Sequence, residues 1–297
     1  MIYEIYHETK FDYAGLVTFS HNMARLKPKD CSTQKLLEYS LTINPNPSET
    51  NEFIDYFENT NNYMVIRESH KCLKVIATSK VKRVDDEITK ELESIKNIKF
   101  TFKELKQRLG SYHSEDVLAK YFLFETESIP TASNEIKEYA LESFKDDRNI
   151  IEAANEFTAR IFNDFKFVSG FSDITTPIEV IFKEKKGVCQ DFAQFAISAL
   201  RSIGIPTRYV SGYIQTHPAE GKEKLFGADA SHAWFSIYIP DFGWADFDPT
   251  NNKIPDVQYI ILGHGRDYLD ISPLKGVVQS SSGSSLLSVS VDVKVLD

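Results

Sequence analysis

The spacing of apolar residues changes near residue 85, and this change constrains the fold more than any other feature. Before it, apolar and polar side chains alternate at residues 37–43 and 73–81, and residues 63–68 form another apolar run. A period of two indicates strands with one buried face. After it, apolar residues recur three or four positions apart, most clearly over 149–165, which indicates helices. The chain therefore predicts an α+β fold that begins with an antiparallel, β-sandwich-like region.

The same change divides the chain of 297 residues. A length near 300 residues favours about two domains. We predict a β-rich N-terminal domain at 1–84, a helical connecting segment at 85–144 and a C-terminal domain at 145–297. Residues 287–295 alternate again, so we predict a final strand there that completes the N-terminal sheet. Shorter helices are predicted at 101–109, 115–123 and 134–144, and a turn at 59–62.

Charge and cysteine content exclude several classes of protein. The chain has 34 Lys and Arg residues against 43 Asp and Glu residues, a net charge of −9. This balance argues against binding to nucleic acid or to anionic lipid. Three cysteines make no disulfide framework and indicate a reducing compartment. With no signal peptide at the N-terminus and no apolar stretch of about 20 residues, the expectation is a cytoplasmic protein that does not span a membrane.

Cys189 is the first candidate for a catalytic residue. Apolar positions from 192 to 203 fall on one helical face, and Gly204 is a typical residue to end that helix. Cys189 would then lie in the first turn, where free N–H groups and the helix dipole stabilise a thiolate and can bind an oxyanion. The alternative is a buried cysteine that serves only as a small core side chain.

A predicted hairpin brings a histidine and an aspartate together. Residues 231–239 and 244–250 read as strands joined by the turn at 240–243. Ala233 and Phe235 would face the core, and His232 would lie on the opposite, polar face beside Asp248. A carboxylate fixes the tautomer of a histidine and favours its charged form, and an imidazolium beside a cysteine gives a thiolate–imidazolium pair. Taken singly, each residue could be structural, His232 as a strand-edge histidine and Asp248 as a turn cap.

Blocks around these residues resemble the transglutaminase-like superfamily, and in particular its bacterial cysteine peptidases. The blocks are residues 187–193, 204–213, 231–234, 243–250 and 265–268. The first 84 residues resemble the β-rich region that precedes this domain in bacterial members. Residues 55–59 are similar to its motif, in which the family usually has Gly where this chain has Glu58.

The resemblance implies a papain-like core, with the nucleophile helix packed on an antiparallel sheet. It implies a triad of Cys189 as nucleophile, His232 as general base and acid, and Asp248 as the residue that orients the histidine. The reaction implied is acyl transfer from a carboxamide of a peptide or protein through a thioester. Hydrolysis by a peptidase or amidase is preferred, and transfer to an amine by a transglutaminase is the alternative.

Arylamine acetyl transfer and glycoprotein deglycosylation use a similar triad, although the zinc-site cysteines typical of deglycosylating members are absent. A binding protein that keeps the fold without turnover is a further alternative. The oxygen-rich segment 246–252 does not match a calcium-binding EF-hand loop, so no metal or cofactor is predicted. Arg208 and Arg266 either contact substrate or pair with carboxylates, of which pairing is preferred, and His264 is predicted to lie in a loop.

Overall fold

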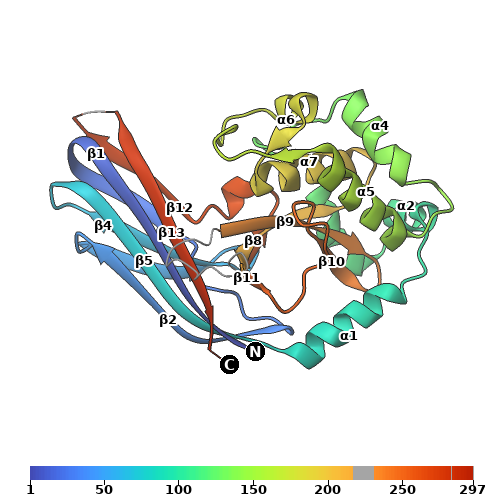
Figure 1. Ribbon diagram of the computed structural model, residues 1–297, viewed down its shortest axis with the longest axis horizontal. Helices are drawn as coiled ribbons and strands as arrows, with labels where there is room; N and C mark the ends of the chain where they lie inside the picture. The colour runs from blue at the N-terminus through green and yellow to red at the C-terminus, as the bar shows by residue number, and fades with distance from the viewer. Residues whose placement is uncertain (217–230, 282, 297) are drawn as a thin grey trace, which may run out of the picture.

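The computed structural model describes residues 1–216, 231–281 and 283–296, and in these ranges it contains two large antiparallel sheets and a group of helices (Figure 1). The strands are β1 (Ile2–Ala24), β2 (Gln34–Asn44), β3 (Glu49–Ile54), β4 (Thr60–Ile66), β5 (His70–Arg83), β6 (Lys166–Phe167), β7 (Lys186–Gly187), β8 (Thr207–Ile214), β9 (Ser231–Ile239), β10 (Gly243–Phe247), β11 (Tyr259–Gly265), β12 (Leu274–Ser280) and β13 (Ser285–Val295). The helices are α1 (Asp85–Lys96), α2 (Phe102–Gly110), α3 (Val117–Lys120), α4 (Asn134–Ser143), α5 (Ile150–Asp164), α6 (Ile178–Glu184) and α7 (Cys189–Ser202), with short 3₁₀ turns η1 (Ser114–Asp116), η2 (Tyr121–Leu123) and η3 (Tyr268–Asp270).

The long strand β1 organises the N-terminal sheet. Its strand order is β2-β5-β1-β4-β3, and β12 and β13 also pair with β1. The first half of β1 pairs with β5 and β13, and the second half mainly with β4 and β12. The predicted antiparallel region is confirmed, and so is the tail strand that completes it. The tail strands belong to the predicted 145–297 segment in sequence but to this sheet in space, and the division into domains stays a prediction.

The C-terminal sheet has the order β10-β9-β8-β11 and is antiparallel throughout. Helix α7 packs on one face of it through a core that includes Phe195 and Phe235. Tyr213 of β8 and Ile260 of β11 pack instead with Tyr3 and other residues of the N-terminal sheet. Figure 1 shows the C-terminal sheet between helices α4 to α7 and the N-terminal sheet. The predicted α+β architecture is therefore confirmed.

The helical predictions differ in accuracy. The periodic segment 149–165 forms α5, and the Asn149 side chain accepts hydrogen bonds from the first-turn N–H groups. Segments 101–109 and 134–144 form α2 and α4, which begin after Thr101 and Ser133. Segment 115–123 is instead divided among η1, α3 and η2. None of the helices in the described part of the chain is long and apolar enough to cross a membrane.

The face of β9 predicted to be polar is buried as deeply as the core face. Trp234 and Ser236 have no exposed surface. Ile88 of α1 and Arg83 of β5 lie across a narrow cavity from Trp234, so α1 and the N-terminal sheet cover this side. The prediction of a polar face was incomplete because alternation within one strand cannot show which distant segment covers it.

Two buried side-chain amides join the N-terminal sheet to the free edge of β11. Gln34 accepts from the Ile261 N–H at 2.8 Å through Oε1 and donates to the Ile261 carbonyl at 2.8 Å through Nε2. Asn59 binds the His264 backbone in the same way, at 2.8 and 3.1 Å. His264 therefore lies in a strand, which corrects the prediction of a loop. Gly263 suggested that loop, but it is needed because a Cβ there would lie 2.2 Å from Asn59 Oδ1.

Replacing Glu58 with Gly should stabilise the protein by about 0.5–1 kcal/mol. Glu58 has a φ of +61°, in the left-handed region, within the turn that Asp55 closes by accepting the Phe57 N–H. This turn lies before β4, four residues earlier than predicted. The Glu58 side chain is 81% exposed and has a 3.3 Å contact with Lys29, so little is lost with it. Urea unfolding checks the effect, with Lys185→Gly as the contrast.

Lys185 has a similar φ of +53° at the end of α6, but its ammonium lies 3.8 Å from the centroid of the Phe182 ring. Replacement by glycine also removes the Lys185 side chain and this contact. The loss should cancel the stability that glycine gives at a left-handed backbone position. An equal stabilisation by both substitutions would contradict the explanation from side-chain contacts.

Acid should destabilise the fold through His7, which is 1% exposed on β1. Its Nδ1 lies 2.8 Å from the Tyr213 hydroxyl oxygen. Burial lowers the pKa of His7 from 6.5 to about 4. The unfolded chain therefore binds more protons over this range, so the stability present above pH 6.5 is lost as the pH falls toward 4. We expect a loss of about 3 kcal/mol from this residue.

Urea unfolding at neutral and acidic pH measures this loss in wild type, in His7→Gln and in the control His113→Gln, which alters a partly exposed residue. His7→Gln should be less dependent on pH, whatever its stability at neutral pH. The same pH dependence in all three proteins would exclude His7 as the cause.

Candidate active site

Cys189 is the first residue of α7, and its predicted position is confirmed. The helix runs from Cys189 to Ser202, and Gly204 follows it with a φ of +86°. Val188 has an extended backbone, so the chain turns sharply into the helix at the cysteine. The thiol is half-buried and lies beside the free N–H groups of the first turn.

Asp191 holds the chain in this conformation, and sequence reasoning missed its role. Its carboxylate accepts the Val188 N–H at 2.7 Å and the Ser172 hydroxyl. A Cβ on Gly187 would lie 2.7 Å from Asp191 Oδ2, which is why a glycine stands there. Burial raises the pKa of Asp191, and these two hydrogen bonds oppose that rise. An acidic residue three positions into a predicted helix was the available signal.

The hairpin of β9 and β10 brings His232 and Asp248 together. The strands pair Trp244 with Tyr238 and Phe247 with Phe235, and Asp248 follows directly. His232 Nε2 lies 2.7 Å from Asp248 Oδ2, so the predicted contact between these two side chains is confirmed. Both residues are buried, with exposed fractions of 7% and 0%.

Within the described ranges, the Asp248 carboxylate accepts five hydrogen bonds. Oδ2 is bound by His232, by the Asn251 side-chain amide at 2.7 Å and by the Tyr259 hydroxyl at 2.7 Å. Oδ1 is bound by the backbone N–H groups of Thr250 and Asn251 at 2.8 and 3.3 Å. Burial alone would raise the pKa of Asp248, but these donors outweigh it and lower that pKa. The carboxylate therefore stays charged beside the histidine.

His232 lies between this carboxylate and Cys189. Burial alone would lower the pKa of His232, but hydrogen bonds with Asp248 and Cys189 raise it overall. Because Nε2 is bound to Asp248, Nδ1 is the ring nitrogen left for Cys189. The geometry can therefore keep the imidazole charged beside the sulfur.

Trp234 closes the site on the side of the N-terminal sheet. Its ring centroid lies 6.0 Å from that of His232 and 5.4 Å from that of Tyr259. The ring reaches this position because Gly212 faces it, and a Cβ at 212 would lie 2.6 Å from the Trp234 ring. Trp234 therefore gives the site apolar cover on this side, whereas Trp244 packs on Phe122 instead.

The two arginines considered in the sequence behave differently. Arg266 pairs with Asp270 at 2.9 Å, as predicted. Arg208 has no carboxylate within ion-pair distance among the described residues, and its guanidinium carbon lies 4.4 Å from the Trp244 ring centroid. Among the described residues Arg208 therefore lacks the predicted carboxylate partner, because the neighbouring acids Glu91 and Asp246 lie across a cavity. The described residues also hold no group of three side chains suited to a metal ion.

Two family models match the chain. The model for the bacterial transglutaminase-like N-terminal region matches residues 3–82, and the model for the transglutaminase-like superfamily matches residues 137–249. The second range contains Cys189, His232 and Asp248.

Three similar proteins extend this result. An uncharacterised protein of Mycobacterium tuberculosis is 33% identical over 298 residues, which cover 98% of this chain and 92% of that protein. A candidate cysteine protease from Cytophaga hutchinsonii has the same fold, with a TM-score of 0.76 and 20% identity over 100% of this chain and 91% of that one. A protein-glutamine gamma-glutamyltransferase of Pseudomonas aeruginosa is 34% identical over 80 residues, which are 26% of this chain and 12% of that protein.

Proposed function

The chain belongs to the transglutaminase-like superfamily, whose fold carries cysteine-dependent acyl transfer, and from this premise we propose that it hydrolyses peptide or isopeptide bonds through a thioester on Cys189. In this proposal His232 is the general base and acid, and Asp248 orients it. The substrate is a peptide or protein.

The position of His232 is the observation that carries the proposal. Its ring is buried, one nitrogen is held by a charged carboxylate, and Cys189 at a helix N-terminus is its other partner. A histidine with only a structural role would not need a charged carboxylate on one side of its ring and a thiol on the other. This arrangement instead supplies a nucleophile, a proton carrier and an orienting group in one line.

The proposed reaction uses these contacts. The Cys189 sulfur attacks the carbonyl carbon of the amide, and the first-turn N–H groups of α7 receive the oxyanion. The proton on His232 passes to the amide nitrogen, the C–N bond breaks, and the amine leaves a thioester on Cys189. Water then attacks the thioester and gives its proton to His232, which releases the carboxylic acid and restores the thiolate–imidazolium pair.

Transfer to an amine is the second candidate, because a region of this chain is similar to a protein named as a protein-glutamine gamma-glutamyltransferase. The acylation step is the same, and an amine replaces water in the second step.

The three cysteines of the chain are free thiols, which fits a reducing compartment such as the cytoplasm for either reaction.

Mass spectrometry of a peptide library incubated with the protein tests the proposal, with and without a primary amine such as cadaverine. New peptide termini, or glutamine converted to glutamate, support hydrolysis. Cadaverine attached to glutamine overturns hydrolysis in favour of transamidation. Both products should disappear in Cys189→Ala and persist in the matched variant Cys72→Ala. If wild type and both variants give no product, the result favours a binding protein that only keeps the fold.

A further inference from the structure

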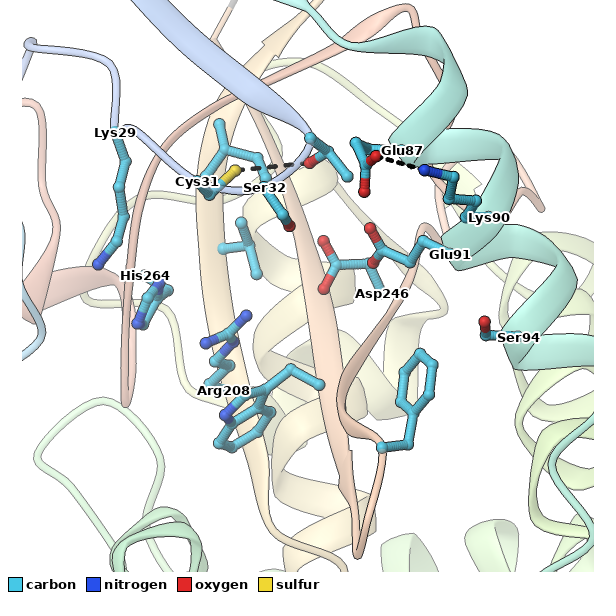
Figure 2. A pocket seen from close by; sticks show the side chains of 15 residues that line it. Lys29, Cys31, Ser32, Glu87, Lys90, Glu91, Ser94, Arg208, Asp246 and His264 are labelled. Carbon is cyan, nitrogen blue, oxygen red and sulfur yellow. Dashed lines mark hydrogen bonds and ion pairs between the residues drawn. The ribbon is translucent and has the colours of Figure 1, made fainter.

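A second cavity lies on the face of the C-terminal sheet opposite α7. It has a volume of about 460 Å³ and is lined by the β1–β2 connection at residues 29–33, by helix α1 and by strands β8, β10 and β11 (Figure 2). This volume is in the range that holds small molecules. Cys189, His232 and Asp248 do not line it, so a ligand there is not the substrate of the triad.

Positively charged side chains line one side of the cavity, and Arg208 among them has no carboxylate partner within the described residues. Arg208 stacks on Trp244, and its buried Nε has no hydrogen-bond acceptor among the described residues. Within the described residues its guanidinium forms no ion pair, although such a group offers donors in the fork that a carboxylate fits. Lys29 and His264 lie on the same side (Figure 2). Burial, together with the charges of Arg208 and Lys29, lowers the pKa of His264 to about 2, so the imidazole is neutral there.

The opposite side carries negative charge. The carboxylates of Glu91 on α1 and Asp246 on β10 lie side by side in Figure 2. Burial raises the pKa of Glu91 to about 7, and repulsion by Asp246 adds to that rise. An ammonium group held between the two carboxylates would offset both the burial of Glu91 and its repulsion by Asp246.

The two sides face each other across the cavity (Figure 2). The charges of Asp246 and Glu91 act on Arg208, yet its guanidinium nitrogens lie more than 4.0 Å from the carboxylate oxygens of both. We propose that the cavity binds a free α-amino acid, with its carboxylate on Arg208 and its ammonium group between Glu91 and Asp246. The rings of Phe242 and Trp244 also line the cavity and provide apolar contact for the amino acid side chain.

Isothermal titration of the full chain with each of the twenty L-amino acids tests this proposal. At least one should bind with a Kd below about 1 mM. Arg208→Gln and Glu91→Gln should each weaken that affinity by tenfold or more. Arg208→Gln removes the charge that binds the carboxylate of the amino acid, and Glu91→Gln removes a charge that binds its ammonium group. The matched variant Arg67→Gln, which changes an exposed arginine of the N-terminal sheet, should leave it unchanged. Propionate and ethylamine, which carry only one of the two charges, should bind at least tenfold more weakly than the amino acid.

Three results would overturn the proposal. These are no binding by any amino acid, binding that survives both cavity variants, and binding of propionate as tight as that of the amino acid. Circular dichroism melting shows whether each variant folds. If Arg208→Gln does not fold, Glu91→Gln on the partly exposed face of α1 decides alone. The readout is binding, so the result does not depend on the activity proposed for Cys189.

Discussion

Replacing His232 with alanine is expected to lower kcat for amide cleavage by about four orders of magnitude while KM changes far less. In the proposed mechanism His232 carries the proton that the leaving amine must receive, and it keeps a cation beside the Cys189 sulfur. Neither role concerns the parts of a substrate that lie away from the scissile bond. The measurement is kcat and KM on a peptide identified by the library experiment.

The matched control is His70→Ala, which removes another buried histidine, one that contacts the Glu68 carbonyl in the N-terminal sheet. It should affect stability more than kcat. A comparable fall in kcat for both variants would show that His232 acts through folding alone.

A readout independent of the substrate follows from the coupling of the two side chains. Because hydrogen bonds with Asp248 and Cys189 raise the pKa of His232, an imidazolium should lie beside the Cys189 sulfur and promote its attack on an alkylating agent. Iodoacetamide should therefore alkylate Cys189 faster than Cys72, because burial raises the pKa of the Cys72 thiol. This reactivity should disappear in His232→Ala. Equal alkylation of wild type and variant would argue against the ion pair.

The parts of the site that the sequence predicted are those encoded by local patterns. The helix at Cys189 follows from a stripe of apolar residues and a terminal glycine. The contact between His232 and Asp248 follows from two alternating runs and a short turn, because strand pairing in a hairpin is determined by the turn. In both cases the residues that determine the geometry lie within about 20 positions of one another.

The parts that the sequence did not predict depend on contacts between distant segments. The Tyr259 hydroxyl that binds Asp248 comes from β11, whose partner β8 is separated from it by the whole β9–β10 hairpin. The strand β1 was missed because buried positions hold polar residues such as His7 and Thr9, which blur the apolar alternation. The cavity near Arg208 joins five segments that no single period links.

Replacing Asp248 with asparagine is expected to lower kcat by about four orders of magnitude, although the side chain keeps its size. The backbone N–H groups of Thr250 and Asn251 both point at Oδ1, so an amide would place its oxygen there. Its NH₂ group would then occupy the position of Oδ2 and donate to His232 Nε2. That contact forces the proton onto Nδ1 and leaves the imidazole neutral, so it can neither accept the proton of the Cys189 thiol nor form the ion pair.

Replacing Asp248 with alanine should in addition destabilise the fold by about 3–5 kcal/mol. It leaves the Tyr259 hydroxyl, the Asn251 amide and two backbone N–H groups without their buried acceptor. Because the folded-state pKa of Asp248 is lowered, its contribution to stability is present above the unfolded pKa and is lost as the pH falls. Asp248→Ala should therefore lose less stability on acidification than wild type does.

Asp267→Asn is the matched control for both variants. Asp267 is a second buried aspartate that closes a turn, where it accepts the Leu269 N–H at 2.9 Å, but it does not contact His232. Its replacement should reduce stability with little effect on kcat at temperatures where the protein is folded. Urea unfolding and steady-state kinetics on the three variants separate the two roles of Asp248. If Asp248→Asn retained wild-type kcat, the carboxylate would be only a turn cap, and the assignment of an orienting role would fail.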